Sequence, residues 1–184
     1  FSILIPARNA EKNIADCLQS IQQLNYPKHQ YEVIVMDDFS DDATVATAQQ
    51  FAGVKVIQLK DVVKEKINSY KKKAIEIGVE HSKGKYIVTT DADCVVTKNW
   101  LQTIAAFYEQ NDPAFIVMPV KYSCNNHFLE IFQALDFMTL QGITGASVHK
   151  KIHSMCNGAN LAYTKKAFED VNGFKDIDNI ASGD

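Results

Sequence analysis

The stretch Val33-Ile34-Val35-Met36, which continues as Asp37-Asp38-Phe39-Ser40-Asp41-Asp42, decides how we interpret the fold. Its four apolar residues do not alternate with polar ones, which predicts a strand whose two faces are both covered. The carboxylates come where that strand ends. In α/β sheets, ligands bind at the carboxyl ends of the strands. The stretch therefore predicts a buried strand that leads into a polar site.

Similar short apolar runs recur along the chain, with helical patterns between them. We predict strands at Ser2–Pro6, Val33–Met36, Val54–Leu59, Tyr86–Thr90 and Phe115–Val120. We predict helices at Ala10–Leu24, Asp42–Ala52, Lys64–His81 and Lys98–Gln110. Strands that alternate with helices favour an α/β fold, with a mainly parallel central sheet flanked by helices.

The regular alternation of predicted strands and helices ends after Val120. The broad apolar face of Asn125–Gln141 predicts a helix that packs in the core, with a docking surface for a membrane or a partner as the alternative. A segment of Gly, Thr and Ser follows up to Ser147. A short strand at Leu161–Tyr163 and a helix from Thr164 come next. No linker separates the two parts. We therefore expect residues 1–184 to form a single domain, with one half at about 1–120 and a second at about 121–184.

Composition narrows the class of protein. The chain has 184 residues, 46% of them hydrophobic, and a formal charge of -3, which argues against disorder and against nucleic acid as a partner. Its four cysteines lie far apart and no signal peptide precedes them, so we expect reduced thiols and a cytoplasmic location. The chain opens at Phe1 inside an apolar run and closes at Asp184 inside a polar segment. We interpret it as a piece cut at both ends from a longer protein, whose association with the cytoplasmic face of a membrane stays open.

Two clusters of acids follow predicted strands. Ser40, Asp41 and Asp42 fit the capping of the next helix, whereas Asp37 and Asp38 stand directly at a strand end, where a carboxylate has to be solvated, paired or used. We expect at least one of this pair to contact a ligand.

The second cluster, Asp91-Ala92-Asp93, follows the strand at Tyr86–Thr90. Two carboxylates there suit Mg²⁺ or Mn²⁺ bound to a diphosphate, with helix capping as the alternative. The chain has neither a P-loop nor a dinucleotide fingerprint. Lys71-Lys72-Lys73 would help to neutralise the phosphates, unless these lysines form only a solvated helix face.

With these residues in place, the chain resembles the inverting glycosyltransferases of family 2, which have the GT-A nucleotide-sugar fold. Four motifs in order carry the resemblance: the opening strand with its Pro-x-x-Asn turn, the Val-Asp-Asp-Gly-Ser-x-Asp segment, the Asp-x-Asp strand, and the stretch that runs from Gly-x-Asn to Gly-Gly-Phe. In this sequence they are Ser2–Asn9, Val33–Asp42, Gly84–Asp93, and Asn157–Tyr163 with Asn172-Gly173-Phe174. Phe39 stands where the family commonly has Gly, and Glu76 where many members have Asn.

The resemblance implies a role for each matching residue. Asp38 would accept a hydrogen bond from uracil or another base. Asp91 would lie near the ribose or the metal, and Asp93 would hold the metal against the diphosphate. Gly158 and Asn160 would line the sugar and acceptor pocket. Asp184, at the end of Ser182-Gly183-Asp184, would take the proton of the acceptor hydroxyl, unless the base lies beyond it. The residues implied in donor binding are Pro6, Ala7, Arg8, Asn9, Asp37, Asp38, Lys71, Asp91, Ala92 and Asp93.

The implied function is a metal-dependent, inverting transfer of a sugar from a nucleotide sugar, with UDP as the expected nucleotide, to a saccharide or lipid-linked hydroxyl in polysaccharide biosynthesis. Two alternatives stay open. One is a nucleotide-sugar binding module without turnover. The other is a phosphatase of the haloacid dehalogenase type, in which Asp91 would be the nucleophile, although its loop normally ends the first strand of the domain.

Overall fold

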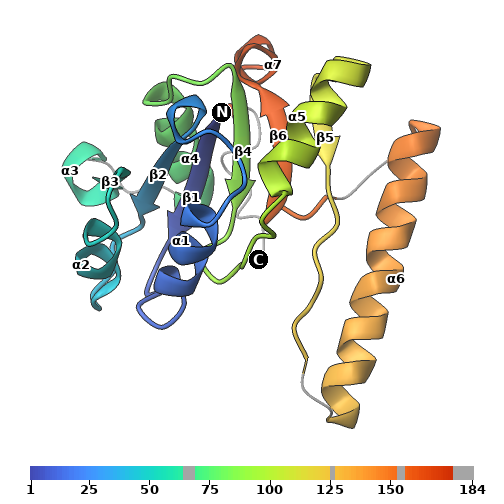
Figure 1. Cartoon of the computed structure of the whole chain (residues 1–184), viewed down its shortest axis with the longest axis horizontal. Coiled ribbons are helices and arrows are strands. Elements are labelled where there is room, and N and C mark those ends of the chain that lie inside the picture. Colours follow the sequence, from blue (N-terminus) through green and yellow to red (C-terminus); the bar gives the residue numbers. More distant parts are fainter. Residues whose placement is uncertain (64–68, 125–126, 153–155, 176–184) are drawn as a thin grey trace.

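A six-stranded sheet with the strand order β3-β2-β1-β4-β6-β5 forms the centre of the molecule (Figure 1). The computed structural model describes residues 1–63, 69–124, 127–152 and 156–175. The strands are β1 (Ser2–Ala7), β2 (Glu32–Asp37), β3 (Val54–Gln58), β4 (Tyr86–Thr90), β5 (Phe115–Val117) and β6 (Asn160–Thr164). The α-helices are α1 (Ile14–Gln22), α2 (Thr44–Gln49), α3 (Leu59–Val62), α4 (Tyr70–Glu80), α5 (Trp100–Asn111), α6 (Phe128–Lys150) and α7 (Lys165–Asp170), and a short 3-10 helix spans Lys28–Gln30.

Strand directions confirm the prediction of a mainly parallel sheet. Strands β3, β2, β1 and β4 are mutually parallel, whereas β6 pairs antiparallel with both β4 and β5. From β1 the chain first builds β2 and β3 on one side, and then returns to add β4 on the other side. The order of the strands therefore reverses at β1, which is where α/β sheets open a crevice for a ligand.

Helices cover both faces of the sheet because successive side chains of a buried strand point to opposite faces. In β1, Ile3 and Ile5 pack in a core with residues of α1 and α5, whereas Leu4 packs in a second core with residues of α4. All three side chains are fully buried. The apolar runs of β1, β2 and β4 thus have the meaning predicted for them, namely strands covered on both faces. The runs of β3 and β5 were also predicted to be buried, but these strands form the two edges of the sheet and are only partly buried.

The predicted elements of the first half are confirmed, with shifts at their ends. The first helix begins at Ile14 instead of Ala10, and the second covers only Thr44–Gln49. The described part of the predicted helix 64–81 is α4, which begins at Tyr70, and residues 64–68 lie outside the described ranges. Sequence patterns predict the ends of helices poorly, because capping contacts with other segments decide where a helix begins and ends.

Helix α6 contradicts the prediction that it packs in the core. None of its residues is buried, and the side chains of Phe128 and Met138 are 85% and 59% exposed. Figure 1 shows α6 standing apart from the sheet at the end of an extended connection. The apolar pattern indicates which face of a helix avoids water, but it does not indicate which segment packs against that face.

The same helix also runs past its predicted end. It continues through Gly142 and Gly145 to Lys150, where a segment of Gly, Thr and Ser was predicted up to Ser147. A glycine in a helix costs about 1 kcal/mol relative to alanine, which weakens the helix without ending it. Across the described ranges, α6 included, we find no helix that is both long enough and apolar enough to cross a bilayer.

Candidate active site

The ends of three neighbouring strands bring the predicted donor-binding residues together. Strand β1 lies between β2 and β4, and Ala7 at the end of β1 is in register with Asp37 at the end of β2. Asp91 follows the last residue of β4 on the other side. Segments far apart in the sequence therefore meet at one edge of the sheet, as the sequence predicts.

Asn9 connects the loop after β1 to the loop after β2. It adopts a left-handed backbone conformation, with φ of 48°. Its backbone N–H donates to Ser40 Oγ at 3.0 Å, and its side-chain Oδ1 accepts from the backbone N–H of Asp41 at 3.0 Å. The side chain of this predicted donor-binding residue thus fixes the shape of the site by holding two loops together.

The acidic cluster after β2 divides into two sets. Asp42 accepts hydrogen bonds from the backbone N–H and the hydroxyl of Thr44, at the start of α2, and these bonds hold its pKa below the ordinary value. Asp42 thus satisfies a backbone donor at the helix start, whereas the predicted capping differs in detail, because the N-cap residue of α2 is Ala43 and makes no side-chain capping bond. Asp37 and Asp38 are buried instead, at 1% and 9% exposure.

The buried pair leaves hydrogen-bonding capacity unused. Within the described part of the chain, Oδ1 of Asp37 and Oδ1 of Asp38 have no hydrogen-bond partner. Burial raises the pKa of Asp38, against the opposing effect of the Arg8 guanidinium, whose Nη1 lies 3.8 Å from Asp38 Oδ2; the charge of Asp37 raises this pKa further. A buried acceptor without a donor costs about 1 to 3 kcal/mol. An N–H group of a ligand would offset that cost.

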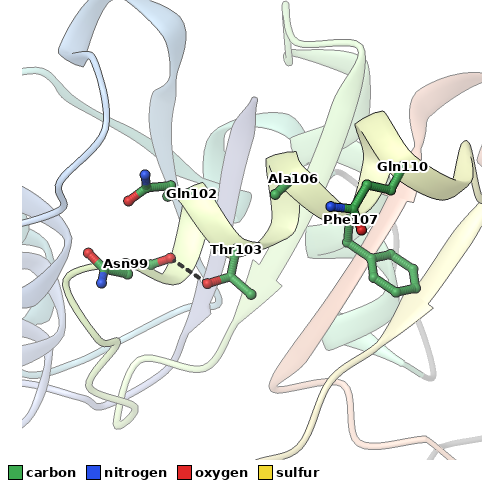
Figure 2. A pocket seen from close by; sticks show the side chains of 6 residues that line it. All are labelled: Asn99, Gln102, Thr103, Ala106, Phe107 and Gln110. Carbon is green, nitrogen blue, oxygen red and sulfur yellow. Dashed lines mark hydrogen bonds between the residues drawn. The ribbon is translucent and has the colours of Figure 1, made fainter.

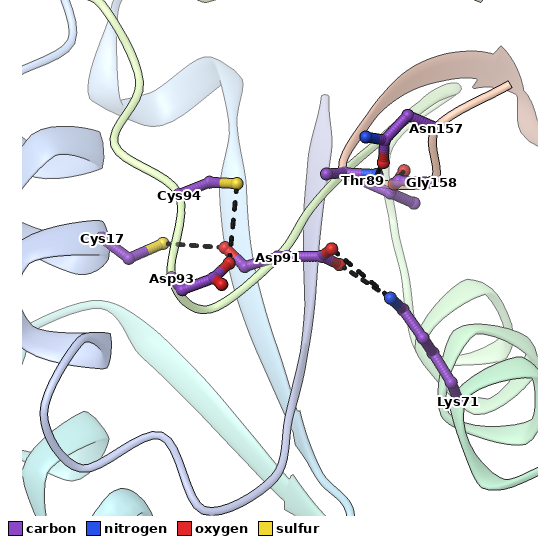
Figure 3. Close-up of polar contacts among 9 residues, drawn as sticks. Cys17, Lys71, Thr89, Asp91, Asp93, Cys94, Asn157 and Gly158 are labelled. Atoms are coloured by element: carbon purple, nitrogen blue, oxygen red, sulfur yellow. Dashed lines mark hydrogen bonds and ion pairs between the residues drawn. The ribbon is translucent and has the colours of Figure 1, made fainter. Parts of the chain in front are cut away.

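Asp91 already holds a positive group. The ammonium of Lys71, near the start of α4, lies 3.2 Å from Asp91 Oδ1 and 3.4 Å from Oδ2 (Figure 3). On the other side of the loop, the Cys17 thiol donates to the backbone carbonyl of Asp91 at 3.6 Å. Burial raises the pKa of Cys17 to about 12, with smaller effects from Cys94, Asp93 and Asp91, so it remains a neutral donor. The sequence predicts both Lys71 and Asp91 at the site, but gives no signal for Cys17.

Asp93 lies apart from the carboxylate of Asp91. Its side chain is on the side of the loop where Cys94 lies, whose Sγ is 3.7 Å from Asp93 Oδ1, while the Asp91 side chain points toward Lys71 (Figure 3). Ala92 between them is buried, and Asp93 is exposed. Across the described ranges, no group of three or more metal-ligating side chains is assembled. The two carboxylates are thus close in sequence and differ in direction.

The predicted acceptor segment lies beside this loop. Strand β6 pairs with β4 so that Asn160 is opposite Thr90, next to the start of the Asp91 loop. The Gly158 carbonyl accepts from Thr89 Oγ1 at 2.8 Å. Asn160 uses both ends of its side chain, since Oδ1 accepts from Trp100 Nε1 and Nδ2 donates to the Pro119 carbonyl. These bonds give Asn160 a positioning role that the sequence does not indicate. Asp184 lies outside the described residues.

Figure 2 shows a concavity that lies elsewhere and does not share the chemistry of this edge. It has a volume of about 510 Å³ and lies along α5, where its lining carries no charged side chain. The lining residues are Asn99, Gln102, Thr103, Ala106, Phe107 and Gln110. Without a cation to neutralise phosphates, this pocket is a poor candidate for a nucleotide diphosphate.

Comparison with known proteins gives consistent results. The sequence profile of Glycosyl transferase family 2 matches residues 2–171. Over 146 residues, or 77% of the chain, the sequence is 33% identical to the 4,4'-diaponeurosporenoate glycosyltransferase of Staphylococcus aureus, of which the match covers 37%. It is 27% identical over 124 residues, or 66% of the chain, to the poly(ribitol-phosphate) beta-N-acetylglucosaminyltransferase TarS of the same organism, of which the match covers 21%. The chain thus spans between a fifth and two fifths of the length of these relatives.

Solved structures share the fold. The crystal structure of S. aureus TarS 1-349 in complex with UDP-GlcNAc superposes with a TM-score of 0.63 and 19% identity, over 94% of this chain and 47% of that one. The mannosyltransferase PcManGT from Pyrobaculum calidifontis, in complex with GDP-Man and Mn²⁺, gives 0.69 and 18%, over 94% and 46%. The fold is therefore of the GT-A type, and with the family profile matching nearly the whole sequence, the chain belongs to glycosyltransferase family 2.

Proposed function

We propose that the edge formed by β1, β2 and β4 binds a nucleoside-diphosphate sugar, with uridine as the nucleoside, for transfer of the sugar to a hydroxyl of a saccharide or lipid-linked acceptor. One observation carries the proposal. The partnerless buried oxygens of Asp37 and Asp38 lie at the same sheet edge as Lys71, Asp91 and Asp93. Asp38 would accept from the single ring N–H of uracil, and the other three side chains suit a diphosphate with its cation.

The oxygen donors at this edge are of the type that a divalent cation prefers, although the side chains of Asp91 and Asp93 point in different directions here. Asp91 and Asp93 would hold Mn²⁺ or Mg²⁺, ions that proteins often bind through one or two carboxylates, with water and substrate phosphates completing the shell. In this structure the ammonium of Lys71 pairs with the Asp91 carboxylate, which supports the binding of a positive charge at this position. When bound, the ion would supply positive charge to the leaving diphosphate. PcManGT, bound to GDP-Man and Mn²⁺, and TarS, bound to UDP-GlcNAc, offer precedents for such ligands in this fold.

The chain's own residues account for the other requirements of the transfer. Lys71 reaches the edge where the diphosphate would lie, so that its charge can stabilise the leaving group. Asp184, as the general base, would remove the proton of the acceptor hydroxyl as it attacks the sugar in line. A single in-line displacement inverts the configuration at the sugar carbon.

The family match sets aside the phosphatase alternative, because the matched residues 2–171 include Asp91 within a different catalytic family. A nucleotide-sugar binding module remains the second candidate. Incubation with UDP-sugars separates the two, since an enzyme releases UDP by slow hydrolysis of the donor, whereas a module binds the donor and leaves it intact.

Calorimetric titration tests the proposed site. We expect Mn²⁺ to tighten UDP binding at least about tenfold in the wild type, since a bound ion bridges carboxylate and phosphate oxygens, and to have no such effect in Asp93→Ala. Asp170→Ala is the matched control, because it removes an exposed carboxylate that pairs with Lys166 on α7. An equal effect of Mn²⁺ on all three proteins would remove Asp93 from the site, and tighter binding of GDP than of UDP would replace uridine by guanosine.

A further inference from the structure

Phe39 follows the buried carboxylates in an unusual conformation. Its φ is 53°, in the left-handed region that glycine adopts readily and bulky residues rarely adopt. Non-glycine residues held in this region are strained, and they persist where the surrounding structure fixes them. The position therefore keeps a phenylalanine at the cost of strain, which points to a use for the ring.

The ring of Phe39, in the loop after β2, packs against the start of α4. It meets the ring of Tyr70 edge to face, with centroids 5.4 Å apart and an interplanar angle of 80°. Tyr70 is the first residue of α4 and the neighbour of Lys71. Phe39 remains 38% exposed, although it is one of the large apolar side chains. Tyr70 thus supports the ring of Phe39, part of which remains exposed in the loop that follows Asp38.

We infer that Phe39 is the platform on which the base of the donor nucleotide stacks, while Asp38 binds the edge of that base. This inference rests on the proposed function. The site offers an aromatic ring and a carboxylate oxygen without a donor. A nucleobase fits both, because it has a flat face that stacks on an aromatic ring and a ring N–H in the same plane that can donate to the carboxylate. Asp38 Oδ1 is buried and has no partner within the described residues, and Phe39 is the next residue in the chain.

A purely structural role for Phe39 makes opposite predictions. If the ring only anchors Tyr70, its removal destabilises the protein and leaves the base unaffected. If the ring stacks on the base, the backbone at this position gains from glycine while the nucleotide loses affinity. The substitution Phe39→Gly separates the two roles, because glycine adopts a φ of 53° without strain.

The experiment titrates wild type, Phe39→Gly and Phe39→Trp with UDP and with ribose 5-phosphate, in Mn²⁺. We expect Phe39→Gly to bind UDP about tenfold more weakly, to bind the base-free ribose 5-phosphate as the wild type does, and to unfold at the same temperature or higher. Phe39→Trp should keep UDP affinity, since it keeps an aromatic face. Phe107→Ala, which removes an exposed ring from α5, should change neither ligand's affinity.

Several outcomes overturn the inference. Unchanged UDP affinity in Phe39→Gly removes the stacking role and leaves the proposed function intact, provided that the wild type binds UDP. Equal losses of UDP and ribose 5-phosphate show that the ring merely holds the loop. If the wild type binds neither UDP nor GDP, the proposed function fails, and the inference fails with it.

Discussion

At the scale of one residue, Asp38 is expected to lower the stability of the folded protein while it serves in ligand binding. Its side chain is buried at the end of β2, it carries an oxygen without a partner in the described part of the chain, and Arg8 approaches its other oxygen only to 3.8 Å. Burial raises its pKa above the ordinary 3.8. The ionised carboxylate is thus disfavoured in the folded protein until a ligand supplies a donor.

Asp38→Asn should therefore stabilise the protein and weaken UDP binding. Because the folded-state pKa lies above the unfolded one, the folded protein binds more protons between the two values. The stability that this group contributes is present below the ordinary carboxyl pKa and is lost as the pH rises through the raised one. We expect a gain of about 1 kcal/mol in the free energy of unfolding at pH 7.5, shrinking toward about pH 4.

Urea unfolding at the two pH values measures this gain, with Asp41→Asn as the control at an exposed carboxylate nearby. A loss of stability at pH 7.5, or an equal gain at both pH values, would contradict the assignment of a buried, disfavoured charge to Asp38.

Sequence reasoning reached some of these residues and missed others for a physical reason. Asp37, Asp38 and Asp91 were predictable because they follow apolar runs, and the ends of parallel strands meet at one edge. The contacts of Cys17 with Asp91 and of Asn160 with Trp100 join residues 60 or more positions apart. No local pattern specifies such partners, because they depend on how the helices pack on the sheet.

At the scale of the elements, two glycines set how closely segments approach β1. A Cβ on Gly78 in α4 would lie 2.9 Å from Met36 Sδ and 3.1 Å from a methyl group of Leu4, so glycine lets the helix lie close on the sheet. A Cβ on Gly84, before β4, would lie 2.7 Å from backbone atoms of Phe1 and Ser2. Backbone atoms yield less readily than the ends of side chains, so Gly84 is the stricter requirement.

Gly84→Ala should accordingly destabilise the fold by about 1 to 3 kcal/mol, because the added methyl group forces β1 and β4 apart. It also disturbs the hydrogen bond from the Gly84 N–H to Ser2 Oγ. The midpoint of urea unfolding gives the change. Gly142→Ala is the matched control, since a Cβ there meets nothing within 4 Å and alanine favours the helix. If the two variants are equally stable, close approach at Gly84 is not a constraint.

Helices were predicted less well than strands at this scale. The strands of the first half were identifiable because burial on both faces leaves continuous apolar runs. The apolar residues of α6 gave an equally strong signal, yet its side chains are exposed. A strand in the middle of a sheet has its neighbours fixed by hydrogen bonding, whereas a helix satisfies its own backbone, so its pattern leaves its packing partner open.

At the scale of the whole molecule, the order of the strands explains why the candidate site lies where it does. The chain leaves β1 in one direction to build β2 and β3, and returns to place β4 on the other side. This reversal brings the loops after β1, β2 and β4 to one edge, with the start of α4 joined to it through the contact between Lys71 and Asp91. Alternating strands and helices predicted this arrangement, whereas the antiparallel β6 beside β4 was not foreseen.

Hydrogen–deuterium exchange of the backbone, with and without UDP and Mn²⁺, tests most directly whether the nucleotide binds at this edge. We predict slower exchange on ligand addition in residues 37–42, 70–73 and 91–94, because a bound nucleotide diphosphate would order the loops that carry Asp38, Lys71 and Asp91. Residues 99–110, which line the pocket on α5, should exchange at an unchanged rate. Protection confined to 99–110, with none at the strand ends, would contradict the account.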